Sequence, residues 1–322
     1  MNKITVSAPG KLMLLGEHAV VYNRPCLVTA VDQRMMATLE LLDSLDFELE
    51  AEDVKVIGYK KRLYELGVGD IPKGAKFVEI ALKNISEKYP LKSGIKITTK
   101  SEFSSQFGFG SSSASTVCVV KAMSETLNLN LSNKEIFDFS FKTVLDIQGK
   151  GSGFDVAAAV YGGTLYFVTG GKIIEPLNIK SLPLIVGYSG IKADTVTLIN
   201  KVKESFVGRE NRLEEIYNAM TMLVDEAKTA FLDEDLAKVG ELMNKDQVLL
   251  KELGVSIDKL DKMIDVSIRV GAYGAKLSGA GGGDCMIALS PENRKQAVID
   301  GINSVGEIIN VRTNAEGVRV EL

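Results

Sequence analysis

The chain has 322 residues, of which 45% are apolar and 25% are charged, as is typical of a globular protein. Asp and Glu (42) outnumber Lys and Arg (38), so no excess of positive charge is available to bind a nucleic-acid backbone. Three widely spaced cysteines argue against a disulfide framework and indicate a reducing compartment, and a single histidine argues against a structural zinc site. With no signal peptide and no apolar run of about 18 residues, the sequence predicts a cytoplasmic protein without a membrane span.

The first half of the chain predicts short strands with a few helices between them. Residues 35–41 and 47–50 have strand-like patterns, and their closeness in the sequence suggests a meander. Ser132 stands three residues before Glu135, which is the spacing of a capping box and predicts the start of a helix. Further strands are expected over 4–8 and 94–98, and helices over 77–89, 116–122 and 133–145.

The second half changes character near residue 182, where long helical periods begin to dominate. Helices are expected over 195–206, 212–231, 236–253, 257–270 and 292–305. Strands are expected over 184–187, 285–289, 308–311 and 318–322. A half rich in strands followed by a half rich in helices predicts an α+β protein with two domains, 1–180 and 181–322.

A cluster of glycines and serines, Phe107 to Ala114 (FGFGSSSA), runs directly into a predicted helix. Glycines let the backbone approach a ligand closely, and the free amides at a helix start bind anions. The chain contains no Walker A pattern, and Ser113 stands where the third glycine of a dinucleotide fingerprint would be. These residues alone leave two interpretations open, a phosphate-binding loop or an ordinary flexible loop.

Three further clusters have residue types that suit a ligand site. Residues 276–285 (KLSGAGGGDC) hold four glycines within five positions, whose cost in backbone entropy makes a plain turn a poor explanation. Residues 149–155 (GKGSGFD) end on an aspartate that either caps a helix or faces a substrate hydroxyl. Residues 8–11 (APGK) precede the only histidine, His18, and for both Lys11 and His18 ordinary solvation or packing is the alternative to ligand binding.

The order of these clusters, APGK with GEHAVVY, then GFGSSSA, GSGFD and SGAGGGDC, resembles that of the GHMP kinase superfamily. This superfamily includes galactokinases, homoserine kinases, mevalonate kinases and phosphomevalonate kinases, and the resemblance extends from Ala8 to Leu289. It implies a ribosomal-protein-S5-like N-terminal domain, a ferredoxin-like C-terminal domain and ATP in the cleft between them. An α+β protein with the GHMP kinase fold is therefore expected.

The resemblance also implies roles for individual residues. Asp155 falls at the position of the catalytic base and Lys11 at that of a nearby lysine, whose charge favours an ionised carboxylate. Ser112 falls at the Mg²⁺ ligand position. The family's second Mg²⁺ ligand is a Glu, but in this chain Val144 falls near that position. The closest acidic residue is Asp146, which is therefore the expected second ligand. The residues implied to hold ATP lie in two glycine-rich segments: Gly108, Phe109, Gly110, Ser111, Ser112, Ser113, Gly281 and Gly282.

The acceptor alcohol is less tightly defined by the resemblance. Residues 16–22 and 243–256 are similar to mevalonate kinases, whereas 148–157, 188–195 and 283–284 are similar to phosphomevalonate kinases. We expect phosphorylation of mevalonate to 5-phosphomevalonate, with phosphorylation of phosphomevalonate as the alternative. The residues expected at the acceptor are Glu17, His18, Lys150, Lys192, Ser278, Gly279 and Ala280.

Two other classes of function are less favoured by the sequence. A non-catalytic ligand sensor with this fold could lose Lys11 or Asp155 without unfolding, yet both residues are present. A nicotinamide-dependent dehydrogenase would need the third fingerprint glycine that Ser113 replaces. A small molecule and ATP are thus the expected partners, a nucleic acid or a membrane is not expected, and a homodimer is left open.

Overall fold

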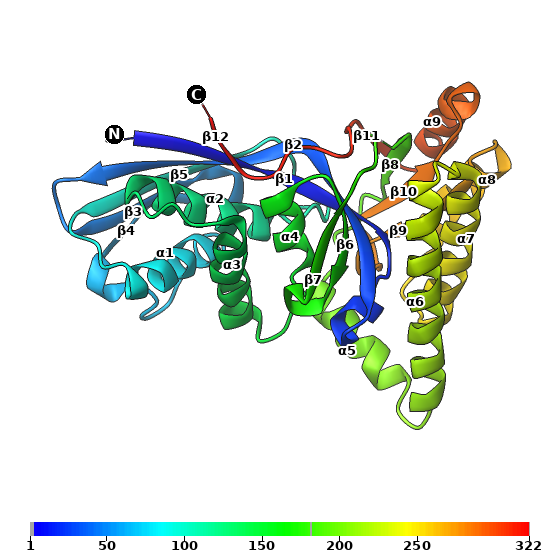
Figure 1. The fold of residues 1–322 in the computed structure, drawn as a ribbon, viewed down its shortest axis with the longest axis horizontal. Helices are drawn as coiled ribbons and strands as arrows, with labels where there is room; N and C mark the ends of the chain where they lie inside the picture. Colours follow the sequence, from blue (N-terminus) through cyan, green and yellow to red (C-terminus); the bar gives the residue numbers. More distant parts are fainter. Residues whose placement is uncertain (1–2, 181, 322) are drawn as a thin grey trace.

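The computed structural model describes residues 3–180 and 182–321, which form two β-sheets flanked by helices (Figure 1). The larger sheet has eight strands in the order β12-β1-β2-β5-β3-β4, with β6 paired to β2 and β7 paired to β6. These strands are β1 (Lys3–Leu15), β2 (Pro25–Leu42), β3 (Asp46–Ala51), β4 (Val56–Arg62), β5 (Gly94–Ser101), β6 (Thr164–Val168), β7 (Ile173–Leu177) and β12 (Arg319–Glu321). The smaller sheet has the order β11-β8-β10-β9 and consists of β8 (Leu184–Tyr188), β9 (Gly274–Ser278), β10 (Cys285–Leu289) and β11 (Glu307–Ile309).

Two groups of helices accompany the two sheets. The first group contains α1 (Lys76–Lys88), α2 (Ser111–Thr126), α3 (Asn133–Gln148) and α4 (Phe154–Tyr161). The second group contains α5 (Thr195–Ser205), α6 (Glu210–Leu232), α7 (Leu236–Glu252), α8 (Asp258–Arg269) and α9 (Lys295–Asn303). Helices α6 and α7 pack together at one end of the molecule (Figure 1). Short 3₁₀ helices span Ala19–Tyr22, Glu52–Val54, Leu63–Glu65, Thr169–Gly171 and Glu292–Arg294.

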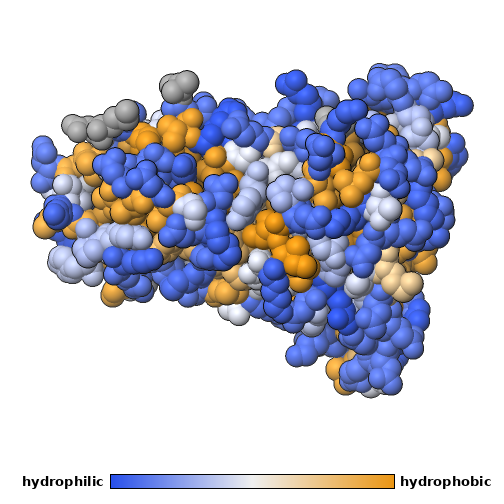
Figure 2. Space-filling view, in the orientation of Figure 1, coloured by the Kyte–Doolittle hydropathy of each residue, from blue (hydrophilic) through white to orange (hydrophobic). Residues whose placement is uncertain are grey.

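Hydrophilic side chains cover most of the face seen in Figure 2, with apolar side chains gathered in patches between them. Within 3–180 and 182–321, no helix combines the length and the apolar character that crossing a membrane requires.

Most of the predicted elements are confirmed. Most of their ends differ by a few residues, but 4–8 and 35–41 are parts of the much longer strands β1 and β2. The capping box at the start of α3 is present, because the Ser132 hydroxyl accepts from the Glu135 amide and the Glu135 carboxylate accepts from the Ser132 amide. The helix expected over 292–305 is divided into a 3₁₀ turn and α9. The last strand is shorter than expected, and Leu322 lies outside the described residues.

The expected meander of residues 35–41 and 47–50 is wrong. Strand β5 lies between β2 and β3, antiparallel to β2 and parallel to β3. The two-residue period of a strand determines which face each side chain takes, but it does not choose the neighbouring strand. The fully buried Ile95 and Ile97 of β5 occupy this position after the chain has passed through β4 and α1.

The final strand returns to the larger sheet. Strand β12 pairs with β1 in antiparallel fashion, and isolated bridges join Val31 to Thr313 and Gly162 to Glu316. The larger sheet therefore takes strands from both sides of residue 180, where the sequence predicts the domain boundary. Residue Ser181 at that boundary lies outside the described residues.

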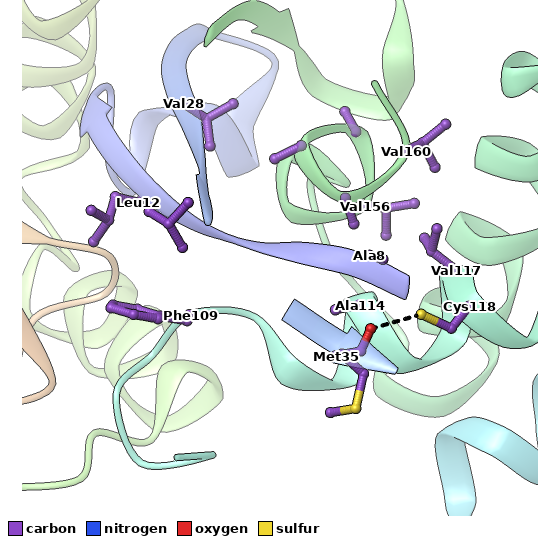
Figure 3. Close-up of a cluster of buried hydrophobic side chains, with 14 of the residues drawn as sticks. Ala8, Leu12, Val28, Met35, Phe109, Ala114, Val117, Cys118, Val156 and Val160 are labelled. Atoms are coloured by element: carbon purple, nitrogen blue, oxygen red, sulfur yellow. Dashed lines mark hydrogen bonds between the residues drawn. The ribbon is translucent and has the colours of Figure 1, made fainter. Parts of the chain in front are cut away.

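A buried apolar cluster joins β1 and β2 to the helices α2 and α4 (Figure 3). Removal of these side chains from water contributes the main stabilising free energy of such a core. Because Ala114 lies in the first turn of α2 and Val156 in the first turn of α4, the cluster fixes the start of each helix against β1. The labelled members of the cluster are Ala8, Leu12, Val28, Met35, Phe109, Ala114, Val117, Cys118, Val156 and Val160.

Arg34 on β2 holds the returning C-terminal segment against the larger sheet. Its buried guanidinium donates to the carbonyl oxygens of Glu316 and Gly317, each at 2.8 Å. It also donates to the Ser7 hydroxyl at 2.6 Å on the neighbouring strand β1. One cation therefore satisfies acceptors from two parts of the chain that are far apart in sequence.

Replacing Arg34 by Ala should lower the free energy of unfolding by at least about 2 kcal/mol, because each buried acceptor left without a donor costs about 1–3 kcal/mol. Urea denaturation measures this change. Arg312→Ala is the matched control, since Arg312 is 88% exposed and its pairing with Asp32 lies at the surface. The control should change the free energy of unfolding by less than about 1 kcal/mol, and equal effects of the two substitutions would contradict the role of Arg34.

Candidate functional site

A cavity of about 240 Å³ lies where elements of the two sheets meet, and all four clusters identified in the sequence reach it. Strand β1 contributes Lys11, and the segment between the smaller sheet's strands β9 and β10 contributes Gly279, Ala280 and Asp284. The cavity is thus assembled from segments more than 250 residues apart along the chain. The expected site residues that line it are Lys11, His18, Gly108, Gly110, Ser111, Ser112, Lys150, Asp155, Lys192, Gly279 and Ala280.

Helix α2 begins at the cavity without a side-chain cap. Its N-cap residue, Gly110, has a φ of +79°, a left-handed conformation that glycine adopts readily, and it makes no side-chain hydrogen bond. The first intrahelical bond runs from the Ala114 amide to the Gly110 carbonyl oxygen at 3.0 Å. The preceding amides of the first turn therefore lack intrahelical acceptors, and they carry the positive end of the helix dipole. This start of α2 suits an anion such as phosphate.

The loop before α2 lies directly against the other half of the cavity. A Cβ atom on Gly108 would come within 2.6 Å of the Asp284 carboxylate, so only glycine lets the two segments approach this closely. Asp284 is held in turn by the Ala193 amide at 3.0 Å and by the Lys192 ammonium at 3.3 Å. Although Asp284 was not among the residues expected at the site, it lines the cavity.

Lys11 is a buried cation beneath the same loop. Its ammonium donates to the Gly108 carbonyl oxygen at 2.7 Å and lies 5.2 Å from the centre of the Phe154 ring. Burial lowers the pKa of Lys11, and the carboxylates of Asp155 and Asp284 oppose this change. A cation so placed adds positive charge at the point where the start of α2 already favours an anion.

Asp155 lies in the first turn of α4, which also begins at the cavity after a glycine without a side-chain cap. One carboxylate oxygen accepts from the Ser113 hydroxyl at 2.5 Å, and the other accepts from the Val156 amide at 3.0 Å. These two donors fix the orientation of the carboxylate. The Ser113 hydroxyl, which was expected to face ATP, is therefore directed to Asp155, and Ser113 does not line the cavity.

The segment from Gly279 to Gly283 brings its first residues to the cavity and packs its later ones elsewhere. Gly279 and Ala280 line the cavity, and the Ala280 carbonyl oxygen accepts from His18 Nε2 at 2.8 Å. Burial lowers the pKa of His18, so the imidazole is neutral and its buried Nδ1 is an acceptor without a partner among the described residues. Gly281 and Gly282, expected at ATP, do not line the cavity. The Gly282 amide donates to the Val255 carbonyl oxygen at 2.7 Å, and a Cβ atom on Gly281 would collide with that oxygen.

The geometry contradicts the expected metal ligand Asp146. Val144 and Gln148, four residues apart on α3, line the cavity, as a helical repeat of 3.6 residues allows. Asp146 lies midway between them and so projects from another face of the helix. There its carboxylate accepts from Lys142 at 2.7 Å and from Asn84 at 2.9 Å.

Three other expected site residues also lie behind the cavity lining. Phe109 is a core residue that packs with Phe103 and Phe107. The Ser278 hydroxyl bonds to both backbone groups of Met13, which joins β9 to β1. Glu17 is fully buried in an ion pair with Lys276. Short-range sequence patterns identify the segments of the site, but they do not reveal which side chains turn away from it.

Comparison with known proteins agrees with this fold. Residues 76–163 match the GHMP kinases N terminal domain, and residues 227–308 match the GHMP kinases C terminal domain. The chain belongs to the GHMP kinase family, and it is an ATP-dependent kinase with the GHMP kinase fold.

Relatives that match over nearly their whole length include mevalonate kinases. The chain is 36% identical to mevalonate kinase of Pyrococcus horikoshii, with 99% of this chain and 98% of that protein covered. The crystal structure of the Methanococcus jannaschii mevalonate kinase superposes with a TM-score of 0.82 at 28% identity, covering 96% of this chain and 97% of the other. A Lin0012 protein from Listeria innocua has a TM-score of 0.89 at 23% identity, with 99% of each chain covered, which supports the fold alone.

Replacing Asp155 by Asn should lower kcat by on the order of 10²-fold or more, because the amide cannot accept the proton of an alcohol. Nucleotide affinity should stay close to that of the unchanged enzyme, since the start of α2 and Lys11 remain in place. Steady-state kinetics and calorimetric titration with nucleotide measure the two quantities. Asp138→Asn, an exposed change on α3, is the control, and near-normal turnover of folded Asp155→Asn protein would contradict a catalytic role.

Proposed function

We propose that the enzyme phosphorylates mevalonate with ATP, giving 5-phosphomevalonate and ADP. The observation that carries this proposal is the match along 99% of the chain to mevalonate kinases, with the four glycine-containing clusters meeting at one cavity. Mevalonate has a primary hydroxyl to be phosphorylated and a carboxylate, so the cavity must hold one alcohol and several negative charges together. The paired helix starts and Lys11 supply the positive potential for this.

The residues of the chain act mainly by placing groups and offsetting charge, as phosphoryl transfer requires. The start of α2 and Lys11 hold the triphosphate. Asp155, oriented by Ser113, accepts a hydrogen bond from the acceptor hydroxyl and takes up its proton as the new O–P bond forms and the bond to ADP breaks. His18 lines the cavity and bonds to the Ala280 carbonyl oxygen, so it helps to shape the wall against which the acceptor is oriented.

The residues at the start of α2 also fit Mg²⁺. No group of three or more His, Cys, Asp or Glu side chains in 3–180 and 182–321 could hold a metal ion by itself. Mg²⁺ in kinase sites needs no such group, because it keeps several waters and binds one or two protein oxygens together with substrate phosphates. Ser112 lines the cavity and is the proposed ligand, with Asp155 and Asp284 as the carboxylates nearby. When bound, the ion would neutralise charge on the transferred phosphoryl group.

Replacing Ser112 by Ala should raise the Mg²⁺ concentration required for half-maximal rate, because one oxygen ligand is lost. Initial rates across a Mg²⁺ titration measure this at saturating ATP. Ser105→Ala is the control, since Ser105 also lines the cavity but lies outside the start of α2. An unchanged Mg²⁺ titration for Ser112→Ala would remove this residue from the metal site.

Phosphomevalonate is the second candidate acceptor. One observation favours it: Lys150 and Lys192, the two lysines expected to bind its phosphate, both line the cavity. Each is already engaged, Lys150 with the Asn200 side chain at 2.6 Å and Lys192 with the Asp284 carboxylate at 3.3 Å. The phosphomevalonate kinase of Streptococcus pneumoniae has a TM-score of 0.80 at 18% identity, which supports a shared fold and not a shared acceptor. Mevalonate is therefore the proposed acceptor.

ADP release measured separately with mevalonate and with phosphomevalonate tests the choice of acceptor. With mevalonate, Lys150→Ala and Lys192→Ala should each change the acceptor KM by less than about threefold, whereas His18→Ala should raise it. With phosphomevalonate as the true acceptor, at least one lysine substitution should cost about 1.5–3 kcal/mol, the scale of a charge-assisted hydrogen bond. The proposal would be overturned if the enzyme released ADP with phosphomevalonate but not with mevalonate, and if His18→Ala left the acceptor KM unchanged. A cytoplasmic location stays a prediction of the sequence, and a homodimer stays open.

A further inference from the structure

Three charged side chains that the proposed reaction does not use are buried together behind the cavity. Glu17 lies in the turn before the 3₁₀ helix Ala19–Tyr22, Asp246 lies on α7 and Lys276 lies on β9. The side chains of all three are completely shielded from solvent. The Lys276 ammonium bonds to Glu17 and to the Leu277 carbonyl oxygen, and it lies 3.4 Å from the Asp246 carboxylate. We call these three residues the buried triad.

The buried triad lacks one positive charge and one donor. Two ionised carboxylates around a single ammonium would leave a net negative charge out of contact with water, which is strongly unfavourable in a protein interior. Both carboxylate oxygens of Asp246 and the second oxygen of Glu17 have no hydrogen-bond donor among the described residues. A proton on Asp246 would remove the excess charge and would provide a donor for Glu17.

Two members of the buried triad, Glu17 and Lys276, are connected through the backbone to residues that line the cavity. Glu17 is followed directly by His18, whose backbone has a φ of +59°, an unfavourable conformation that its surroundings must hold. Lys276 stands on the strand that leads to Gly279 and Ala280. The imidazole of His18 and the carbonyl group of Ala280 meet at 2.8 Å on the cavity wall. The ion pair of Glu17 with Lys276 therefore lies directly behind the pair that faces the acceptor.

We propose that Asp246 is a positioning residue that stays protonated in the folded enzyme and donates a hydrogen bond to Glu17, so that the neutral triad holds His18 and Ala280 in place for the acceptor. Asp246 does not touch the substrates. It acts through Glu17 and Lys276, which connect the turn at His18 to β9.

The surroundings of the triad support a proton at this place. Burial is the largest cause that raises the pKa of Asp246, to about 8, and the charge of Glu17 adds to it while Lys276 opposes it. Glu17 is faced in addition by His18 and by the thiol of Cys26 on β2. Burial lowers the pKa of His18 and raises the pKa of Cys26, so neither adds a charge near neutral pH. Glu17 and Lys276 are therefore the charged groups that decide the protonation of Asp246.

The sign of the pH dependence follows from the raised pKa. The folded chain keeps the proton of Asp246 over a range in which an exposed aspartate, with an ordinary pKa of 3.8, has lost it. The stabilisation of the folded state by this proton is complete below the ordinary value and declines as the pH rises toward about 8. Above that pH the folded triad carries excess negative charge, and we expect the acceptor KM to rise.

The test compares Asp246→Asn with the unchanged enzyme and with Asp265→Asn, an exposed control on α8. The amide of Asn can donate to Glu17 but cannot lose a proton. Relative to Asp246→Asn, the unfolding constant of the unchanged enzyme should rise by up to about tenfold per pH unit between about pH 6 and pH 8. The acceptor KM of Asp246→Asn should stay within about threefold of normal at pH 7 and should not rise above pH 8. Asp246→Ala should raise this KM at pH 7, and Asp265→Asn should follow the unchanged enzyme.

Infrared spectroscopy gives a readout that is independent of activity. At neutral pH the unchanged enzyme should show the C=O stretching band of a protonated carboxyl group, which disappears on titration above about pH 8 and is missing in Asp246→Asn. Absence of this band from the unchanged enzyme would overturn the proposal even if Asp246→Asn fails to fold. A stability difference that does not vary with pH would also overturn it. The KM readout alone rests on the proposed function, whereas the infrared and stability readouts stand if a different acceptor is found.

Discussion

Two helices begin at one cavity without side-chain caps, and this local excess of hydrogen-bond donors is the constraint around which the site is arranged. Helices α2 and α4 both start after glycines with positive φ, and the buried Lys11 lies between them and the loop at Gly108. Free amides and a buried ammonium are unfavourable unless acceptors reach them. The cavity is therefore suited to a polyanion. The apolar cluster beneath it, which packs both helices on β1, holds the donors in position (Figure 3).

The cavity depends equally on contacts between the two sheets. The Ser278 hydroxyl ties β9 to Met13 on β1, and His18 bonds to the carbonyl group of Ala280. Asp284 approaches Gly108 so closely that a side chain there would collide with it. Interactions that pack the smaller sheet on the larger one are thus the same interactions that shape the site. A ligand that binds between them would stabilise the whole molecule, because it adds contacts to both sides.

Sequence patterns predicted the helices of this chain and the glycine-rich segments, and the resemblance to GHMP kinases implied Lys11 and Asp155 at the site, where both line the cavity. They failed where the outcome depends on contacts between distant segments. The meander was wrong because alternation does not select a neighbouring strand, and Asp146 was wrong because its position on α3 directs it to Lys142. The pairing of Ser113 with Asp155 joins two different helices, so no local pattern reveals it. The buried triad could not be predicted from the sequence either. Its three residues are far apart along the chain, and only the fold brings them together and shields them from solvent.

A crystal structure with mevalonate and a non-hydrolysable ATP analogue would show directly whether the cavity holds both substrates. We expect the triphosphate to lie against the first amides of α2 and the ammonium of Lys11. We also expect the terminal hydroxyl of mevalonate to lie within hydrogen-bond distance of Asp155, with the rest of the acceptor between His18 and Ala280. Phosphates bound away from the start of α2, or an acceptor hydroxyl out of reach of Asp155, would contradict the proposed arrangement of the site.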